Sequence, residues 1–252
     1  MLGRAGLTGL LISAGVVATV GPASAWFFPR RETPRPPPCV LDNCLGNSPD
    51  PSPARRVPGA VGSGFDFYVL ALSWSPGFCS AAGAGRSPSQ CAKGRDLGFV
   101  VHGLWPQNTS GYPSDCDTGV SRSPPRAAID GVSDLYPDPG LARHEWRRHG
   151  TCSGLSPTAY FAAVRQARAA VTIPPQLDAP HDAQQLAPLE ITRAFLAANP
   201  GLQRDAMTVT CRSGMLAEVR ICLTRDLRGF QSCPEVARDA CRTRSLTVPP
   251  PG

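Results

Sequence analysis

Ten cysteines constrain the fold of this 252-residue chain more than any other feature of its sequence. No two of them have the C-x2-C spacing typical of zinc sites, so they predict disulfides rather than bound zinc. Five bridges are possible, and spacing alone does not define the pairs. Cys39–Cys44 and Cys79–Cys91 would each close a short local loop. Because disulfides persist in oxidising compartments, we expect the chain to be exported.

The N-terminus has the features of a secretory signal peptide. Residues 1–25 combine the basic Arg4, an apolar run over residues 7–20 and the small-residue cleavage site Ala23-Ser24-Ala25. The alternative, a membrane anchor, is disfavoured because the segment is short and rich in Gly, Ser and Thr. No later segment is apolar for long enough to cross a bilayer. We therefore expect a secreted or periplasmic protein with no membrane association after cleavage.

The rest of the chain divides into a proline-rich segment and one folded domain. Residues 26–63 carry many prolines among Gly, Ser and Arg, a composition typical of extended or disordered segments. Residues 64–252 contain strand and helix patterns in irregular order, without a βαβ rhythm, which indicates an α+β fold. The patterns predict strands at 66–74, 97–104, 207–211 and 215–223, helices at 158–171 and 189–198, and a loop at 111–125.

The charge balance permits a polyanionic partner without requiring one. The formal net charge is +6, and Lys93 is the only lysine, so nearly all the cations are arginines. Arginine suits forked contacts to phosphate. A GC-rich coding sequence would give the same composition.

Two short stretches, FVVHGLWPQ at 99–107 and HEWRRHGTC at 144–152, hold three of the four histidines. Two imidazoles with a nearby carboxylate and a permanent cation can move two protons and stabilise an anion. Cleavage of a phosphodiester without a metal has these requirements. Taken alone, His102 in the first stretch would more often be a buried structural histidine, and the second stretch is what favours catalysis.

The second stretch has helical spacing. Glu145 and His149 are four residues apart and share a helix face, where the carboxylate can orient the imidazole. His144 and Arg148 have the same spacing, and Arg148 offers a forked phosphate donor. Gly150 is expected to cap the helix and leave His149 at its C-terminus, where the dipole favours the charged imidazole. The zinc-protease pattern H-E-x-x-H is not matched, because these two histidines diverge by about 500° around a helix. We expect no metal.

At the level of motifs, FVVHGLWPQ and HEWRRHGTC resemble the two active-site segments of the ribonuclease T2 family of secreted endoribonucleases. The resemblance extends to ALSWSPGFC at 71–79 and YPSDC at 112–116, and covers residues 64 to about 248. It implies a disulfide-stabilised α+β fold with a central antiparallel sheet flanked by helices. It also implies cleavage of single-stranded RNA to 2′,3′-cyclic phosphates and then 3′-phosphates, with low base specificity. We expect a monomer that acts on RNA without a cofactor.

The resemblance assigns roles to the residues of the two motifs. It implies that His102 and His149 are the catalytic acid and base, and that Glu145 and Arg148 stabilise the transition state. His144 is implied to bind phosphate. Arg148 departs from the lysine that is commonest in the family at this position, but it keeps the positive charge.

A base-binding site is implied as well. Trp105 and Tyr112 resemble the residues that stack on the base in this family, although Trp105 could instead be a packing residue beside the site. Gln107 departs from relatives that carry Asp there, so purine preference does not follow. Trp146 is expected to pack in the core instead.

Disulfide pairs are also implied by the resemblance. They are Cys116–Cys152, the late bridge Cys211–Cys241, and Cys222–Cys233 nested inside it, in addition to the local pair Cys79–Cys91.

A different class of function remains open at this point. The same fold could serve as a catalytically weak, secreted module that binds RNA or another partner. Loss of the histidines would be its sign in the sequence, and both histidines are present.

Overall fold

The computed structural model describes residues 56–57, 64–82, 85 and 87–252. The expected leader, Cys39 and Cys44, and most of the proline-rich segment lie outside the described residues. In the part of the chain that is described, none of the helices has both the length and the apolar character needed to cross a membrane.

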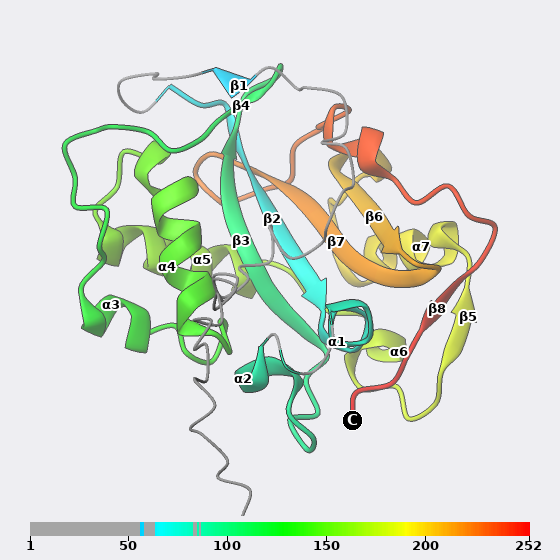
Figure 1. Ribbon diagram of the computed structural model, residues 1–252. Helices are drawn as coiled ribbons and strands as arrows, with labels where there is room; N and C mark the ends of the chain where they lie inside the picture. Colours follow the sequence, from blue (N-terminus) through cyan, green and yellow to red (C-terminus); the bar gives the residue numbers. More distant parts are fainter. Residues whose placement is uncertain (1–55, 58–63, 83–84, 86) are drawn as a thin grey trace, which may run out of the picture. The chain divides into compact units, whose positions relative to one another are not determined.

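The fold is α+β, as the sequence predicts, and is built on a six-stranded sheet (Figure 1). It begins with the edge strand β3 (Phe99–Gln107), followed by β2 (Phe67–Trp74) and β7 (Met215–Thr224), in that order and antiparallel. The two predicted late strands are confirmed as β6 (Met207–Arg212) and β7, and they pair with each other in antiparallel orientation. The expected antiparallel arrangement is confirmed for β3, β2, β7 and β6. Farther along the sheet, β8 (Leu246–Val248) runs parallel to β7 and antiparallel to β5 (Gln184–Leu186). The long connection after β7 carries the chain back to the start of that strand before β8 begins.

Helices and short strands surround this sheet. The two predicted helices are confirmed as α5 (Pro157–Ala169) and α7 (Pro188–Ala198). Ser156 caps α5 by accepting a hydrogen bond from the Ala159 N–H at 3.3 Å. Strand β1 falls in the segment whose composition predicts no fold, and its backbone pairs with β4. The bounds are α1 (Ser75–Ala82), α2 (Pro88–Cys91), α3 (Arg126–Asp130), α4 (Pro139–Arg148), α5 (Pro157–Ala169), α6 (Pro175–Asp178), α7 (Pro188–Ala198), the 3-10 turns η1 (Gly150–Cys152), η2 (Arg204–Ala206) and η3 (Val236–Asp239), and the strands β1 (Arg56–Val57) and β4 (Tyr112–Pro113).

Strand β2 is buried along its whole length because both faces of the sheet are covered there. On one face, Leu70 and Leu72 belong to the main core, together with residues of α4 and α5 such as Trp146. On the other face, Val69 packs in a smaller cluster with Trp105 and the Cys222–Cys233 bridge. The continuous apolar run of β2 therefore reflects a strand that is buried on both faces of the sheet. The placement of Trp146 in the core is as predicted.

A bulge in the β2–β3 pairing decides which side chains of β3 share a face. The register shifts between Ala71 and Leu72, so one residue of β3 is extra at this point. Strict alternation would send His102 and Trp105, three residues apart, to opposite faces. The extra residue restores them to the same face, and their rings are in edge-to-face contact with centroids 5.1 Å apart. The bulge thus gathers two residues of the first motif.

Four disulfides tie the loops to this framework. They are the local pair and the three pairs implied by the resemblance: Cys79–Cys91, Cys116–Cys152, Cys211–Cys241 and Cys222–Cys233.

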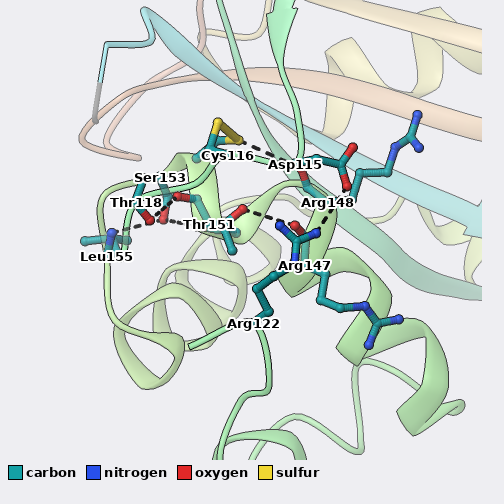
Figure 2. Close-up of a disulfide and its surroundings, with 11 residues drawn as sticks. Asp115, Cys116, Thr118, Arg122, Arg147, Arg148, Thr151, Ser153 and Leu155 are labelled. Carbon is teal, nitrogen blue, oxygen red and sulfur yellow. Dashed lines mark hydrogen bonds and ion pairs between the residues drawn. A yellow bond between two sulfur atoms is a disulfide. The ribbon is translucent and has the colours of Figure 1, made fainter. Parts of the chain in front are cut away.

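The Cys116–Cys152 bridge fixes the loop after β4 to η1, the turn that follows α4 (Figure 2). Beside it, the Asp115 N–H donates to the Arg148 carbonyl at 2.7 Å, and the Thr118 hydroxyl donates to the Thr151 carbonyl at 3.3 Å. The loop therefore satisfies one backbone carbonyl in the last residue of α4 and one in η1, where intrahelical partners are missing.

Removing this bridge should weaken the protein measurably. The paired change Cys116→Ser with Cys152→Ser opens a loop of sequence separation 36, and the chain-entropy model gives a loss of about 4 kcal/mol in the free energy of unfolding. Urea unfolding followed by fluorescence measures this loss. The matched control is Cys79→Ser with Cys91→Ser, which opens a loop of separation 12 and should cost about 3 kcal/mol without affecting activity. An unchanged unfolding midpoint in the first variant would contradict the assigned role.

Candidate active site

Four residues from the two sequence motifs meet at the edge of the sheet formed by β3. His102 and Trp105 come from β3, Glu145 from the last turn of α4, and His149 directly follows that helix. The Trp105 indole N–H donates to Glu145 Oε2 at 2.8 Å. The ring of Trp105 lies 5.1 Å from that of His102 and 5.4 Å from that of His149, between centroids. The two imidazoles, far apart in sequence, therefore contact one indole.

Glycine 103 makes this close approach of helix and strand possible. A β-carbon on Gly103 would lie 2.0 Å from Glu145 Oε2 and 2.2 Å from Trp105 Nε1. Both distances are far inside van der Waals contact. The buried Glu145 carboxylate occupies the space that a side chain at position 103 would fill.

Replacing this glycine should damage the site. In Gly103→Ala the Glu145 carboxylate and the Trp105 indole must both move away from the new methyl group. A misplacement of about 1 Å can cost up to about 100-fold in rate. We expect kcat/KM for RNA to fall by roughly tenfold to 100-fold. Gly229→Ala is the control, because its nearest side-chain atoms would be 3.8 Å from the new carbon. Wild-type activity in Gly103→Ala would show that the contact is dispensable.

His149 is itself the C-cap of α4, which corrects the expectation that Gly150 caps the helix. The His149 N–H donates to the Glu145 carbonyl at 2.9 Å. Gly150 begins the 3-10 turn η1, and its role is packing, since a β-carbon would lie 2.4 Å from the Trp146 ring. His149 nevertheless ends the helix, as predicted, where the helix dipole favours a positive charge. A side-chain contact from Glu145 to His149 stays a prediction.

The Glu145 carboxylate is fully buried, with its side chain 0% exposed. Its Oε1 lies 3.8 Å from His102 Nε2, while Oε2 accepts the hydrogen bond from Trp105. Burial raises the pKa of Tyr136 well above its usual value, and the negative charge of Glu145 adds to the effect. The neighbouring phenol of Tyr136 thus stays neutral.

The other predicted phosphate-contacting residues, His144 and Arg148, lie on α4 and are half-buried. Figure 2 shows the Arg148 side chain extending away from the disulfide, while its carbonyl is held by the loop at Asp115. The loop contact therefore fixes the backbone of Arg148 and leaves the guanidinium to project from the helix.

Gln107 and Tyr112, predicted to contact the base, lie farther along. Gln107 is the last residue of β3 and Tyr112 lies on β4. Gln107 lies five positions after His102 along the strand, a distance of roughly 15 Å. Gln107 therefore lies outside the group formed by His102, Trp105, Glu145 and His149, two residues beyond Trp105 on the same strand.

Sequence reasoning missed three charged residues behind His102. The His102 Nδ1 is hydrogen-bonded to Glu218 of β7. Arg220 Nε donates to Glu218 Oε2 at 2.9 Å, and Arg220 Nη1 donates to Asp239 Oδ2 at 2.7 Å. A sequence signal existed, since opposite charges two residues apart in an otherwise apolar strand share a face and suggest an ion pair within the sheet.

Glu218 is charged in spite of its burial. Desolvation alone would raise the pKa of its carboxyl, but the Arg220 guanidinium and the His102 imidazole outweigh this and lower the pKa to about 2. Burial alone would lower the pKa of Arg220, but the carboxylates of Glu218 and Asp239 outweigh it and raise that pKa. The pair therefore keeps its charges at any pH near neutrality.

The cluster combines groups suited to proton transfer. Two imidazoles contact the same indole, and a buried carboxylate and an arginine lie in the last turn of the same helix. Among the described residues, no three His, Cys, Asp or Glu side chains gather as a metal site requires. The side chains present can donate one proton, accept another and stabilise an anion.

Comparison with known proteins places this arrangement in a family. The model of the ribonuclease T2 family matches residues 65–233. A ribonuclease of Aeromonas hydrophila is 37% identical over 188 residues, covering 73% of this chain and 83% of the relative. Ribonuclease DdI of Dictyostelium discoideum is 27% identical over 202 residues, covering 70% of this chain and 82% of the relative.

Solved structures share the fold. An RNase-related protein from Calystegia sepium superimposes with a TM-score of 0.59 at 21% identity, covering 75% of this chain and 98% of that one. RNase NT, solved in complex with 5′-AMP, gives a TM-score of 0.56 at 22% identity, covering 74% and 98%. With the family model matching across both histidine motifs and the fold shared, the chain belongs to the ribonuclease T2 family.

Proposed function

We propose that the protein is an endoribonuclease that cleaves single-stranded RNA by transphosphorylation, with low base specificity. His149 removes the proton of a 2′-OH, and the oxygen attacks the adjacent phosphorus. His102 protonates the departing 5′-oxygen, so one proton is taken up and one is given in the same exchange. The first product carries a 2′,3′-cyclic phosphate, which water then opens to a 3′-phosphate.

One observation supports this proposal above the others: two imidazoles from separate motifs contact the same indole ring. They are thereby close enough to act on the two sides of one phosphate. Membership of the ribonuclease T2 family and the Aeromonas hydrophila ribonuclease support RNA cleavage in general. The mechanism and the assignment of acid and base are our inference.

The remaining motif residues act on the phosphate and the base. Glu145 and Arg148 stabilise the pentacoordinate phosphorus, and His144 binds phosphate. Arginine presents a planar fork of donors that matches phosphate oxygens. Trp105, Tyr112 and Gln107 contact the base, and stacking on an indole tolerates every base.

Cleavage of RNA in excess EDTA tests the function. We expect degradation with 31P NMR signals of a 2′,3′-cyclic phosphate that appear before those of the 3′-phosphate. DNA and an oligonucleotide with a 2′-O-methyl group at every position should survive, because the nucleophile is missing. The rate should follow a bell-shaped pH profile with an optimum between about pH 5 and 8, since one imidazole must be neutral and the other protonated.

Other outcomes would assign a different function. Tight binding of RNA without cleavage would support the non-enzymatic module. A rate that rises steadily into alkaline pH, or activity that returns only when zinc or magnesium is added, would point to a metal-bound hydroxide.

We also propose that the protein works outside the cytosol. Four disulfides in the described part of the chain are compatible with secretion. The relatives include an extracellular ribonuclease of Solanum lycopersicum, which is 32% identical over 101 residues. Mass spectrometry of the mature N-terminus from a culture supernatant or periplasmic extract tests cleavage after Ala25.

A further inference from the structure

The imidazole of His102 has a carboxylate on each side. On the side of α4, Nε2 lies 3.8 Å from Glu145 Oε1. On the side of the sheet, Nδ1 is hydrogen-bonded to Glu218 Oε1. A carboxylate can only accept, so Nδ1 carries the proton of this bond. Nε2 is then the nitrogen that can exchange a proton with a substrate.

Glu218 reaches His102 across an intervening strand. Strands β3 and β7 both flank β2, so their backbones are roughly 10 Å apart. On this face β2 carries small side chains, Ser73, which pairs with Glu218, and Ala71 two residues before it. The side chains of Glu218 and His102 meet above these small residues. A long side chain on β2 would block the contact.

The Glu218 carboxylate is held in place from behind. Arg220 donates to it and is itself held by Asp239 of η3. The guanidinium also lies 5.2 Å from the centroid of the Trp105 ring, within cation–π distance. Glu218 is therefore fixed in position by a charged network that also contacts the indole of the site.

We propose that Glu218 is the positioning residue for His102: it fixes the ring with Nε2 directed at the substrate and favours the imidazolium that protonates the leaving 5′-oxygen. The inference rests on the proposed function, in which His102 is the acid.

The same hydrogen bond serves both halves of the reaction. While His102 is protonated, Glu218 stabilises its positive charge. After the proton leaves Nε2, the Nδ1–H still donates to Glu218, which selects the tautomer with a bare Nε2. That nitrogen is the one that must accept a proton when water opens the cyclic phosphate.

Several charged or titratable groups face His102, and each bears on its protonation. They are Glu145 from α4, Glu218 and Arg220 from β7, Asp239 from η3 behind Arg220, and His149 beyond the Trp105 ring. The carboxylate of Glu218 is hydrogen-bonded directly to the ring, whereas Asp239 acts through Arg220. Removing the Glu218 carboxylate should therefore change the protonation of His102 more than removing the Asp239 carboxylate does.

Glu218→Gln tests the proposal because it keeps an acceptor of similar shape and removes the charge. We expect kcat/KM for a dinucleoside phosphate to fall by roughly tenfold to 100-fold, mainly through kcat. The alkaline limb of the pH–rate profile, which reports loss of the protonated acid, should move to lower pH. Cleavage of a nucleoside 3′-phosphate ester with a nitrophenolate leaving group should fall much less, since this leaving group needs little protonation.

Glu190→Gln is the matched control, because Glu190 accepts a hydrogen bond at the exposed start of α7, and should leave all three readouts unchanged. The single variant at 218 leaves Arg220 without one of its two carboxylates and could lose stability. The double variant Glu218→Gln with Arg220→Gln removes both charges, and it should show the same dependence on the leaving group. Circular dichroism and thermal unfolding verify the fold of each variant.

Two results would overturn the proposal. One is wild-type kcat and pH profile in Glu218→Gln. The other is an equal loss on both substrates with an unmoved profile, which would mean that Glu218 only supports the fold. His102→Ala, measured in parallel, distinguishes failure of the proposed function from failure of the positioning role of Glu218. If His102→Ala cleaves the dinucleoside phosphate as wild type does, the proposed function fails, whereas an inactive His102→Ala beside an unaffected Glu218→Gln refutes only the positioning role.

Discussion

His102→Ala and His149→Ala should each lower the rate of RNA cleavage by ~10²–10⁴-fold, because general acid–base groups contribute this much when they act in the transition state. The double variant should lose little more than the worse single variant, since two groups in one proton exchange are not additive. Initial rates on a labelled oligonucleotide, with thermal unfolding as a check of the fold, measure both effects.

The fourth histidine supplies the control for this experiment. His181 is exposed and lies outside both motifs, so His181→Ala should cleave RNA at the wild-type rate. The assignment of the pair fails if His102→Ala or His149→Ala keeps more than about a tenth of the activity, a far smaller loss than acid–base catalysis predicts.

Arg148→Ala should show the second largest loss. Removing one donor to a developing negative charge typically costs ~3–4 kcal/mol, or roughly 10²–10³-fold in rate. Arg148→Lys should stay within about tenfold of wild type, because lysine keeps the charge but loses the fork. The measurement is kcat/KM on the same oligonucleotide at fixed ionic strength.

The neighbouring arginine is a matched control. Arg147 lies in the same last turn of α4, and Figure 2 shows its side chain directed differently from that of Arg148. The contact of Arg147 with Thr151 uses its carbonyl, which alanine retains. Arg147→Ala should therefore be nearly neutral. Equal rates in Arg148→Ala and Arg147→Ala would mean that Arg148 does not touch the phosphate.

Local patterns in the sequence predict the elements that carry the site. The apolar run of β2 and the capping Ser156 follow from residue preferences, and the four-residue spacing of Glu145 and His149 follows from the helical period. The resemblance of two motifs adds their roles. These inferences need only neighbours in the chain.

Long-range geometry was beyond such reasoning. The bulge beside Ala71 brings His102 and Trp105 to one face, and alternation alone predicts the opposite. The need for glycine at 103 depends on the position of α4, and the contact of Glu218 depends on which strand lies beyond β2. Contacts between residues far apart in the sequence are fixed by tertiary packing, and the local sequence pattern does not predict them.

The order of the strands has a consequence for how the protein folds. The innermost strand, β2, pairs with β7, joining Phe67 to Thr224 across most of the domain's sequence. Contacts with such a large sequence separation raise the contact order, and high contact order slows folding. A nascent chain that has not yet produced β7 lacks the second neighbour of β2 and the carboxylate behind His102. Synthesis must therefore pass residue 224 before the site can be complete, so we expect ribosome-bound chains to be inactive until near the end of translation.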